Sequence, residues 1–181
     1  HILLGKDIVG QAHTGTGKTA AFGLPVLNMM KGQNGVEAVV IVPTRELAMQ
    51  VSDELFRFGK NLNLNTATVY GGQSYSTQLR NIERASIIVA TPGRFLDLLR
   101  GGKINIKPSF VILDEADEML DMGFLDDIKE IFTFLPADRQ TLLFSATMPQ
   151  AIKNLPQTIL KDVAFVTLTK KDRTTAKIND K

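Results

Sequence analysis

The chain has 181 residues, of which 44% are apolar and 22% are charged, and its formal net charge is +2. This length and composition are typical of one soluble globular domain, and the absence of cysteine excludes disulfides and thiolate metal sites. The longest wholly apolar stretch, residues 38–42, is far too short for a membrane span, so we expect a soluble, cytoplasmic protein without a membrane partner. The small positive charge is compatible with nucleic-acid binding but does not argue for it.

Apolar runs of strand length alternate with helical patterns along the whole chain. The predicted strands are residues 7–11, 38–42, 65–70, 86–90, 110–113, 141–144 and 164–168. The predicted helices are residues 18–31, 44–60, 74–84, 93–100, 124–134 and 150–155. Because the strand runs are continuous in Val and Ile, they suit a sheet that is covered on both faces. The alternation predicts an α/β fold with a mostly parallel sheet and helices on both faces.

Two of the predicted helices carry local signals. Gly23 and Pro25 lie inside the first helix, where we expect a kink or a break. Thr44 is placed to cap the second helix, which would present one apolar face. That face consists of Leu47, Val51, Leu55 and Phe58.

The turn after the first predicted strand has the composition of a phosphate-binding loop. Ligands of open α/β sheets bind beyond the carboxyl ends of the strands, where this turn lies. Gly15 and Gly17 permit a close approach of the backbone, and the amides that follow form an anion nest at a helix N-terminus. Lys18 is expected to reach the phosphates and the Thr19 hydroxyl to coordinate Mg²⁺. The alternative is a glycine turn that opens a helix with a solvated lysine.

A carboxylate cluster, residues 114–118, follows the apolar strand 110–113. Mg²⁺ prefers oxygen ligands, so Asp114 is placed to hold the ion through water, and Glu115 to accept a proton from an attacking water. Asp117 and Glu118 are also compatible with the charged first turn of a helix, where negative side chains are favoured. Together with the phosphate loop, the cluster predicts a protein that binds and hydrolyses a nucleoside triphosphate.

Read together, these residues resemble the DEAD-box RNA helicases, whose name spells residues 114–117. Residues 12–19 match the phosphate loop of that family, Ala-x-Thr-Gly-x-Gly-Lys-Thr. Further matches follow in the order of the family: Pro-Thr-Arg-Glu-Leu-Ala at 43–48, the glycine pair 71–72, Thr-Pro-Gly-Arg at 91–94 and Ser-Ala-Thr at 145–147.

The resemblance implies an N-terminal RecA-like helicase domain over residues 1–169. The tail 170–181 would lead to a second RecA-like domain of the same parent chain. It implies RNA-stimulated ATP hydrolysis, coupled to local unwinding or remodelling of RNA duplexes, with ATP and Mg²⁺ as cofactors. The implied catalytic residues are Lys18, Asp114 and Glu115, and the implied metal ligands are Thr19 and Asp114. The implied nucleotide contacts are Ala12, Thr14, Gly15, Thr16, Gly17, Lys18, Thr19 and Asp117. Asp117 would hydrogen-bond to the hydroxyls of Ser145 and Thr147, which would couple the nucleotide site to the RNA site.

The implied RNA contacts lie in three turns, and they would read the sugar–phosphate backbone with little sequence preference. They are Pro43, Thr44, Arg45, Gly71, Gly72, Thr91, Pro92, Gly93 and Arg94. The two prolines each separate a strand from a helix, so each turn offers helix-end amides to a phosphate, and the arginines add charge and fork geometry. Simpler readings stay open: Thr44 as a cap only, Arg45 paired with a helix carboxylate, and the glycine pair as a turn only.

Two parts of the family pattern are expected outside this chain. An adenine-reading segment should precede His1, and the second domain would bring the arginine fingers. We therefore expect the chain alone to bind nucleotide weakly and to hydrolyse it slowly. Two rivals remain: an RNA clamp that uses ATP without unwinding, and an unrelated P-loop ATPase or small-molecule kinase. Protein partners are not predicted.

Overall fold

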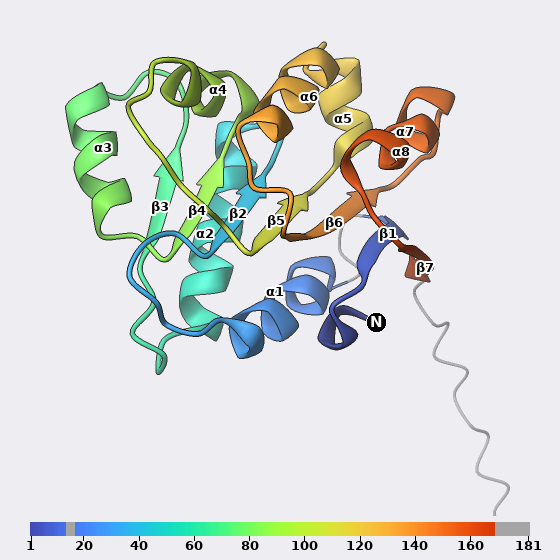
Figure 1. The fold of residues 1–181 in the computed structure, drawn as a ribbon, viewed down its shortest axis with the longest axis horizontal. Helices are drawn as coiled ribbons and strands as arrows, with labels where there is room; N and C mark the ends of the chain where they lie inside the picture. Colours follow the sequence, from blue (N-terminus) through green and yellow to red (C-terminus); the bar gives the residue numbers. More distant parts are fainter. Residues whose placement is uncertain (14–16, 169–181) are drawn as a thin grey trace, which may run out of the picture.

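A seven-stranded parallel sheet forms the centre of the molecule (Figure 1). The computed structural model describes residues 1–13 and 17–168; Thr14, Gly15 and Thr16 of the predicted phosphate loop and the predicted tail 170–181 lie outside the described residues. The strand order is β3-β4-β2-β5-β6-β1-β7. The strands are β1 (Asp7–Ala12), β2 (Ala38–Ile41), β3 (Thr66–Val69), β4 (Ile87–Ala90), β5 (Phe110–Leu113), β6 (Gln140–Ser145) and β7 (Val163–Leu168).

Helices cover both faces of the sheet, as the continuous apolar strands predict (Figure 1). One face carries α1 (Lys18–Met29) and α2 (Arg45–Phe58). The other face carries α3 (Tyr75–Glu83), α4 (Pro92–Arg100), α5 (Ala116–Asp121), α6 (Leu125–Thr133), α7 (Gln150–Asn154) and α8 (Pro156–Ile159). A short 3₁₀ helix, η1 (Ile2–Leu4), precedes β1. Of the described residues, no helix is both long and apolar enough to cross a bilayer.

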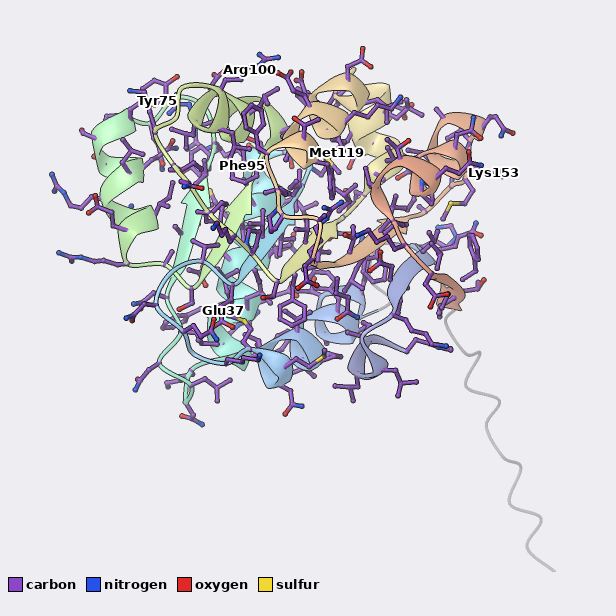
Figure 2. All side chains as sticks on the ribbon, in the orientation of Figure 1. Glu37, Tyr75, Phe95, Arg100, Met119 and Lys153 are labelled. Atoms are coloured by element: carbon purple, nitrogen blue, oxygen red, sulfur yellow. The ribbon has the colours of Figure 1, made fainter. Side chains whose placement is uncertain are left out.

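Each central strand contributes to two separate cores. In β5, Val111 and Leu113 pack under α4, α5 and α6, whereas Phe110 and Ile112 face α1 and α2. This follows from the alternation of side chains across a strand. Burial on both faces explains why β2 and β5 consist of unbroken apolar residues rather than alternating ones. Figure 2 shows Phe95 in the interior of the helical layer, where it is fully buried.

The predicted elements are all present, with ends that shift by one or two residues, but the expected break in the first helix is wrong. Pro25 lies inside α1, which continues to Met29. An internal proline costs about 3 kcal/mol. Phe22 and Val26, on either side of it, are buried against the sheet, and each buried side chain of this kind contributes about 1.5–3 kcal/mol. Gly23 permits this packing, because a Cβ there would lie 2.9 Å from Leu55 Cδ2.

The second helix has its predicted cap and its predicted apolar face. Thr44 Oγ1 accepts a hydrogen bond from the Leu47 amide at 3.2 Å. Val51 and Leu55 are buried, and Phe58 shares their face, 38% exposed at the end of the helix, with its ring beside Gly23 of α1. The helix α8 was not predicted; it begins at Pro156, directly after α7.

The strand order sorts the loops at the carboxyl edge of the sheet into two groups. The turns after β1, β5 and β6 are neighbours, because β6 pairs with both β5 and β1. The turns after β2, β3 and β4 are neighbours, because β4 pairs with both β2 and β3. The first group carries the phosphate loop and the carboxylates, and the second carries the three turns with the implied RNA contacts.

Candidate functional site

Lys18 and Asp114 form a buried ion pair at the carboxyl ends of β1 and β5. Lys18 is the first residue of α1, and Gly17 before it has a left-handed backbone with φ 76°. Lys18 Nζ lies 2.7 Å from Asp114 Oδ1 and 3.6 Å from Glu115 Oε1. The side chains of Lys18 and Asp114 are 8% and 1% exposed. The structure thus brings together the cation of one predicted motif and the carboxylates of the other.

Asp114 has the properties of a ligand for a hard cation. Burial raises the pKa of its carboxyl, and the nearby Lys18 ammonium opposes that rise. Asp114 Oδ2 is buried and accepts no hydrogen bond from any residue that the structure describes. A buried oxygen without a partner fits the hydration shell of Mg²⁺, and Thr19, the other predicted ligand, is half-buried in the first turn of α1. The described residues contain no cluster of three metal-ligating side chains, so phosphates and water would complete the coordination.

Glu115 differs from Asp114 in both exposure and backbone. Its side chain is 18% exposed, so a water molecule can reach it. Its backbone is left-handed, with φ 57° and ψ 52°, which costs a non-glycine residue about 1–3 kcal/mol and is characteristic of functional positions. A hydrogen bond with Glu115, burial and the charges of Glu115 and Asp117 raise the pKa of Glu118 to about 7, against the effect of Lys18.

Asp117 connects α5 to the turn after β6. The Thr147 hydroxyl and amide both donate to Asp117 Oδ2, at 2.8 and 3.0 Å. Partial burial raises the pKa of the Asp117 carboxyl, but the hydrogen bonds from the Thr147 hydroxyl and amide outweigh it and hold the pKa below its usual value. The Thr147 contact agrees with the expectation from the resemblance.

Asp117 is also hydrogen-bonded to the Ser145 hydroxyl, as expected, but through its backbone amide. Ser145 Oγ accepts from the backbone amide of Asp117 at 3.1 Å and donates to the Thr147 carbonyl at 2.7 Å. The reason is that Asp117 lies in the first turn of α5, where the amide has no partner within the helix. Asp117 and Glu118 are thus also the charged first turn that the sequence allowed.

Replacing Thr147 by Val is expected to lower the free energy of unfolding by about 0.5–1 kcal/mol at pH 7, since this contact is partly exposed. A carboxyl with a lowered folded pKa stabilises the fold above its unfolded pKa, and this contribution is lost as the pH falls through the folded pKa. The deficit of Thr147→Val should therefore disappear in acid. Urea unfolding between pH 2 and pH 7 measures it. Thr133→Val is the control, because Thr133 donates to the Glu130 carbonyl and its loss should not depend on pH.

The turn after β2 has a capped helix end and an exposed arginine. Pro43 is buried, and Thr44 caps α2 as described above. Arg45 lies with its guanidinium 5.0 Å from the ring centre of Tyr70, and within the described part of the chain it forms no ion pair with a carboxylate. This removes the alternative in which Arg45 pairs with a helix carboxylate. The exposed cation lies beside the turn that follows β3.

The turns after β3 and β4 are joined by side chains. Gly71 and Gly72 are exposed, and Gly72 has a φ of 91°, which favours glycine. Thr91 precedes α4 without a side-chain cap, and Pro92 is its first residue. Arg94 Nη1 donates to the Gln73 carbonyl at 2.8 Å and to Gln78 Oε1 at 2.9 Å.

Arg94 also lies 4.2 Å from the ring centre of Tyr75, so this guanidinium is partly committed to the protein itself. Sequence reasoning missed Gln73, Gln78 and both tyrosines. Nothing in the local pattern distinguishes these residues from ordinary polar positions of an exposed helix and its preceding turn.

Comparison with known proteins gives the family of the chain. Residues 1–155 match the model of the DEAD/DEAH box helicase family. The chain belongs to the DEAD/DEAH box helicase family. It is 55% identical over 163 residues to the DEAD-box ATP-dependent RNA helicase RhpA of Helicobacter pylori, and 50% identical over 176 residues to CshA of Streptococcus pneumoniae. These alignments cover 89% and 96% of this chain, but only 33% and 34% of the two relatives.

Solved structures of the family have the same fold. The crystal structure of a DEAD box protein from the hyperthermophile Methanococcus jannaschii superposes with a TM-score of 0.89 at 44% identity. That match covers 93% of this chain and 47% of the other. This structural match establishes the RecA-like architecture independently of the motifs. The chain spans about a third of the length of the helicase relatives named above.

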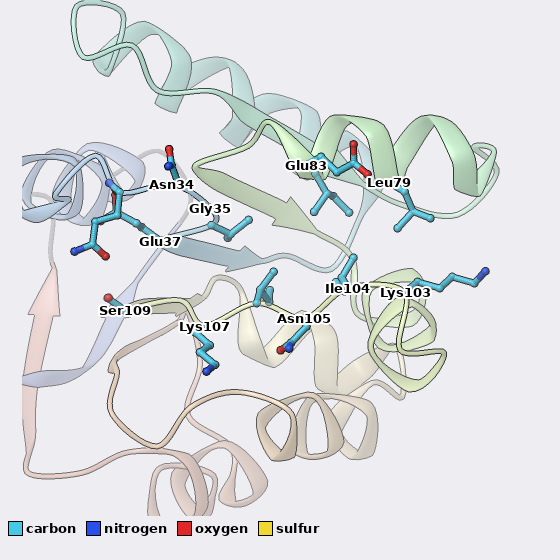
Figure 3. A pocket seen from close by; sticks show the side chains of 14 residues that line it. Asn34, Gly35, Glu37, Leu79, Glu83, Lys103, Ile104, Asn105, Lys107 and Ser109 are labelled. Atoms are coloured by element: carbon cyan, nitrogen blue, oxygen red, sulfur yellow. Dashed lines mark hydrogen bonds between the residues drawn. The ribbon is translucent and has the colours of Figure 1, made fainter.

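A separate cavity of this family member lies away from both groups of turns. It has a volume of about 530 Å³ and is bounded by the loop before β2, the C-terminal half of α3 and the segment between α4 and β5 (Figure 3). Glu37 on its wall is buried and accepts hydrogen bonds from the amides of Lys31 and Gln33, both at 2.8 Å. Its position before β2 and β5 places it at the amino edge of the sheet, opposite the candidate site.

Proposed function

We propose that this chain is the ATP-binding domain of an ATP-dependent RNA helicase. The parent protein would hydrolyse ATP in response to RNA and use the cycle to unwind or remodel short RNA duplexes. The observation that carries this proposal is the buried Lys18–Asp114 pair beside the solvent-accessible Glu115, at adjacent strand ends of a DEAD/DEAH box family member. The names of the relatives, ATP-dependent RNA helicases, support it.

The nucleotide side has the groups that phosphoryl transfer to water requires. Lys18 would exchange Asp114 for the β- and γ-phosphates, and the amides at the start of α1 would donate to the phosphate oxygens. Asp114 and Thr19 would hold Mg²⁺, which would supply charge neutralisation at those oxygens. Glu115 would orient the attacking water and accept its proton. Ala12, Asp117 and residues 14–16 are the other predicted nucleotide contacts.

RNA would bind along the second group of turns. Three features of these turns favour binding of a sugar–phosphate backbone. They are the positive charges of Arg45 and Arg94, the helix N-termini of α2 and α4, and the glycine pair, which has no side chains to block a close approach. Pro43, Thr44, Thr91, Pro92 and Gly93 would shape these turns or contribute amides. Binding through the backbone predicts little sequence preference.

The link between the two sides would run through Asp117, Thr147 and Ser145. These residues join α5, which follows the carboxylates, to the turn after β6. A second RecA-like domain of the parent chain would meet the same edge of the sheet. The compartment that we propose for the parent protein is the cytoplasm.

ATP hydrolysis by the full-length protein, measured with and without single-stranded RNA, tests the proposal. We expect RNA to raise turnover, and a strand-separation assay to show ATP-dependent release of a short duplex. Turnover that is unaffected by RNA would contradict the proposal and favour an unrelated P-loop ATPase. Stimulation without strand release would leave the RNA-dependent ATPase intact and contradict unwinding.

The 181-residue chain by itself is expected to hydrolyse ATP slowly, with little stimulation by RNA. No arginine among the described residues contacts the Lys18–Asp114–Glu115 group, and a transition-state arginine typically contributes a factor of about 10³–10⁵. Phosphate release at saturating ATP, compared with the full-length protein at equal concentration, measures this difference. Equal turnover in the two would show that the chain already contains a complete catalytic site.

A further inference from the structure

We propose that Gln78 is a positioning residue that holds the three candidate RNA-binding turns in one arrangement, an inference that rests on the proposed RNA-binding function. Gln78 lies on α3, is 1% exposed and contacts neither the nucleotide side nor solvent. Its amide makes three hydrogen bonds, all to the turns after β3 and β4.

The amide nitrogen of Gln78 holds both ends of the glycine turn. Nε2 donates to the Tyr70 carbonyl at 2.7 Å and to Gln73 Oε1 at 2.9 Å. Tyr70 directly precedes Gly71 and Gly72, and Gln73 directly follows them. The glycines have no side chains with which to fix their own turn, so Gln78 supplies the anchor from outside it.

The amide oxygen of Gln78 holds the arginine of the next turn. Arg94 Nη1 donates to Gln78 Oε1 at 2.9 Å and to the Gln73 carbonyl at 2.8 Å. The orientation of the amide is unambiguous, because a guanidinium can only donate and the Tyr70 carbonyl can only accept. Glutamine satisfies both partners at once, whereas glutamate or leucine would leave at least one buried group without its partner.

The third turn joins this network through Tyr70. Gln73 Nε2 donates to the Tyr70 hydroxyl at 2.7 Å, and the Arg45 guanidinium lies 5.0 Å from the centre of the Tyr70 ring. Gln78 is therefore connected to Arg45, the glycine pair and Arg94, which come from the turns after β2, β3 and β4. A satisfied buried polar network of this kind selects one arrangement of the groups that it joins.

The experiment compares two buried glutamines in the full-length protein. Gln78→Met removes all three hydrogen bonds at nearly constant volume. Gln140→Met is the matched control: Gln140 is 7% exposed and its Nε2 donates to the Ile2 and Lys6 carbonyls, at the amino end of β6. Binding of a fluorescent single-stranded RNA of mixed sequence, binding of a fluorescent ADP analogue and thermal unfolding are measured for the wild type and both variants.

We expect Gln78→Met to weaken RNA binding by about tenfold while the ADP analogue binds as in the wild type, and Gln140→Met to lower stability without weakening RNA binding. Unchanged RNA binding in Gln78→Met, or an equal loss in both variants, would overturn the inference. If Gln78→Met does not fold, Gln78→Glu takes its place, since it removes only the two donors to the glycine turn. Wild-type protein that does not bind RNA would instead contradict the proposed function.

Discussion

Replacing Glu115 by Gln in the full-length protein is expected to lower RNA-stimulated ATP turnover by a factor of about 10²–10⁴, the usual contribution of a general base. The amide keeps the size and polarity of the side chain but cannot accept a proton. ATP and RNA should still bind, because Lys18, Asp114 and the three candidate RNA-binding turns are unchanged. Single-turnover hydrolysis and equilibrium binding of labelled ATP separate the two effects.

Glu118→Gln is the control for this prediction. Glu118 lies one turn further along α5, and the hydrogen bond that it shares with Glu115 helps to raise its own pKa to about 7. If Glu115 is the base, turnover of Glu118→Gln stays near that of the wild type. A loss of turnover in Glu118→Gln with activity retained in Glu115→Gln would assign the base to Glu118.

Replacing Lys18 by Met is expected to destabilise the chain by about 3–5 kcal/mol near neutral pH, because it leaves the Asp114 carboxylate buried without a cation. Removal of Lys18 also removes the interaction that opposes the raised pKa of Asp114. A carboxyl whose folded pKa is raised destabilises the fold above its unfolded pKa, so stability should improve as the pH falls. Urea unfolding at several pH values measures both the size and the direction of this change.

The double variant Lys18→Met/Asp114→Asn isolates the pair. A neutral amide carries no charge to desolvate, so most of the lost stability should return. Nucleotide binding should stay weak, since neither the phosphate cation nor the metal carboxylate remains. A double variant as unstable as Lys18→Met alone would mean that Lys18 stabilises the fold through packing of its aliphatic stem rather than through Asp114.

The ion pair has a consequence for nucleotide binding. In the structure Lys18 is paired with Asp114, so the phosphates must interact with the ammonium group more strongly than the carboxylate does. Asp114 would then lose the Lys18 ammonium, and a bound Mg²⁺ would replace that positive charge. Phosphate and metal are therefore expected to bind together more tightly than either does alone.

Much of the fold was predictable because its signals are local. The central strands β2 and β5 are unbroken apolar runs, and the helix that Thr44 caps begins where its hydroxyl can bind the Leu47 amide. A break at Pro25 was the wrong alternative, because burial of Phe22 and Val26 outweighs the cost of an internal proline.

The sequence by itself determined which chemical groups the chain has and at which strand ends they stand, since motif residues are neighbours along the chain. Only the tertiary structure decided that β6 lies between β5 and β1, which brings Lys18 within 2.7 Å of Asp114 in a buried site. It likewise decided that Gln78, a polar residue on an exposed helix, is buried and hydrogen-bonded to two turns from different parts of the chain. The physical reason is that strand pairing and burial are long-range properties: they depend on which elements meet, and no local spacing records that.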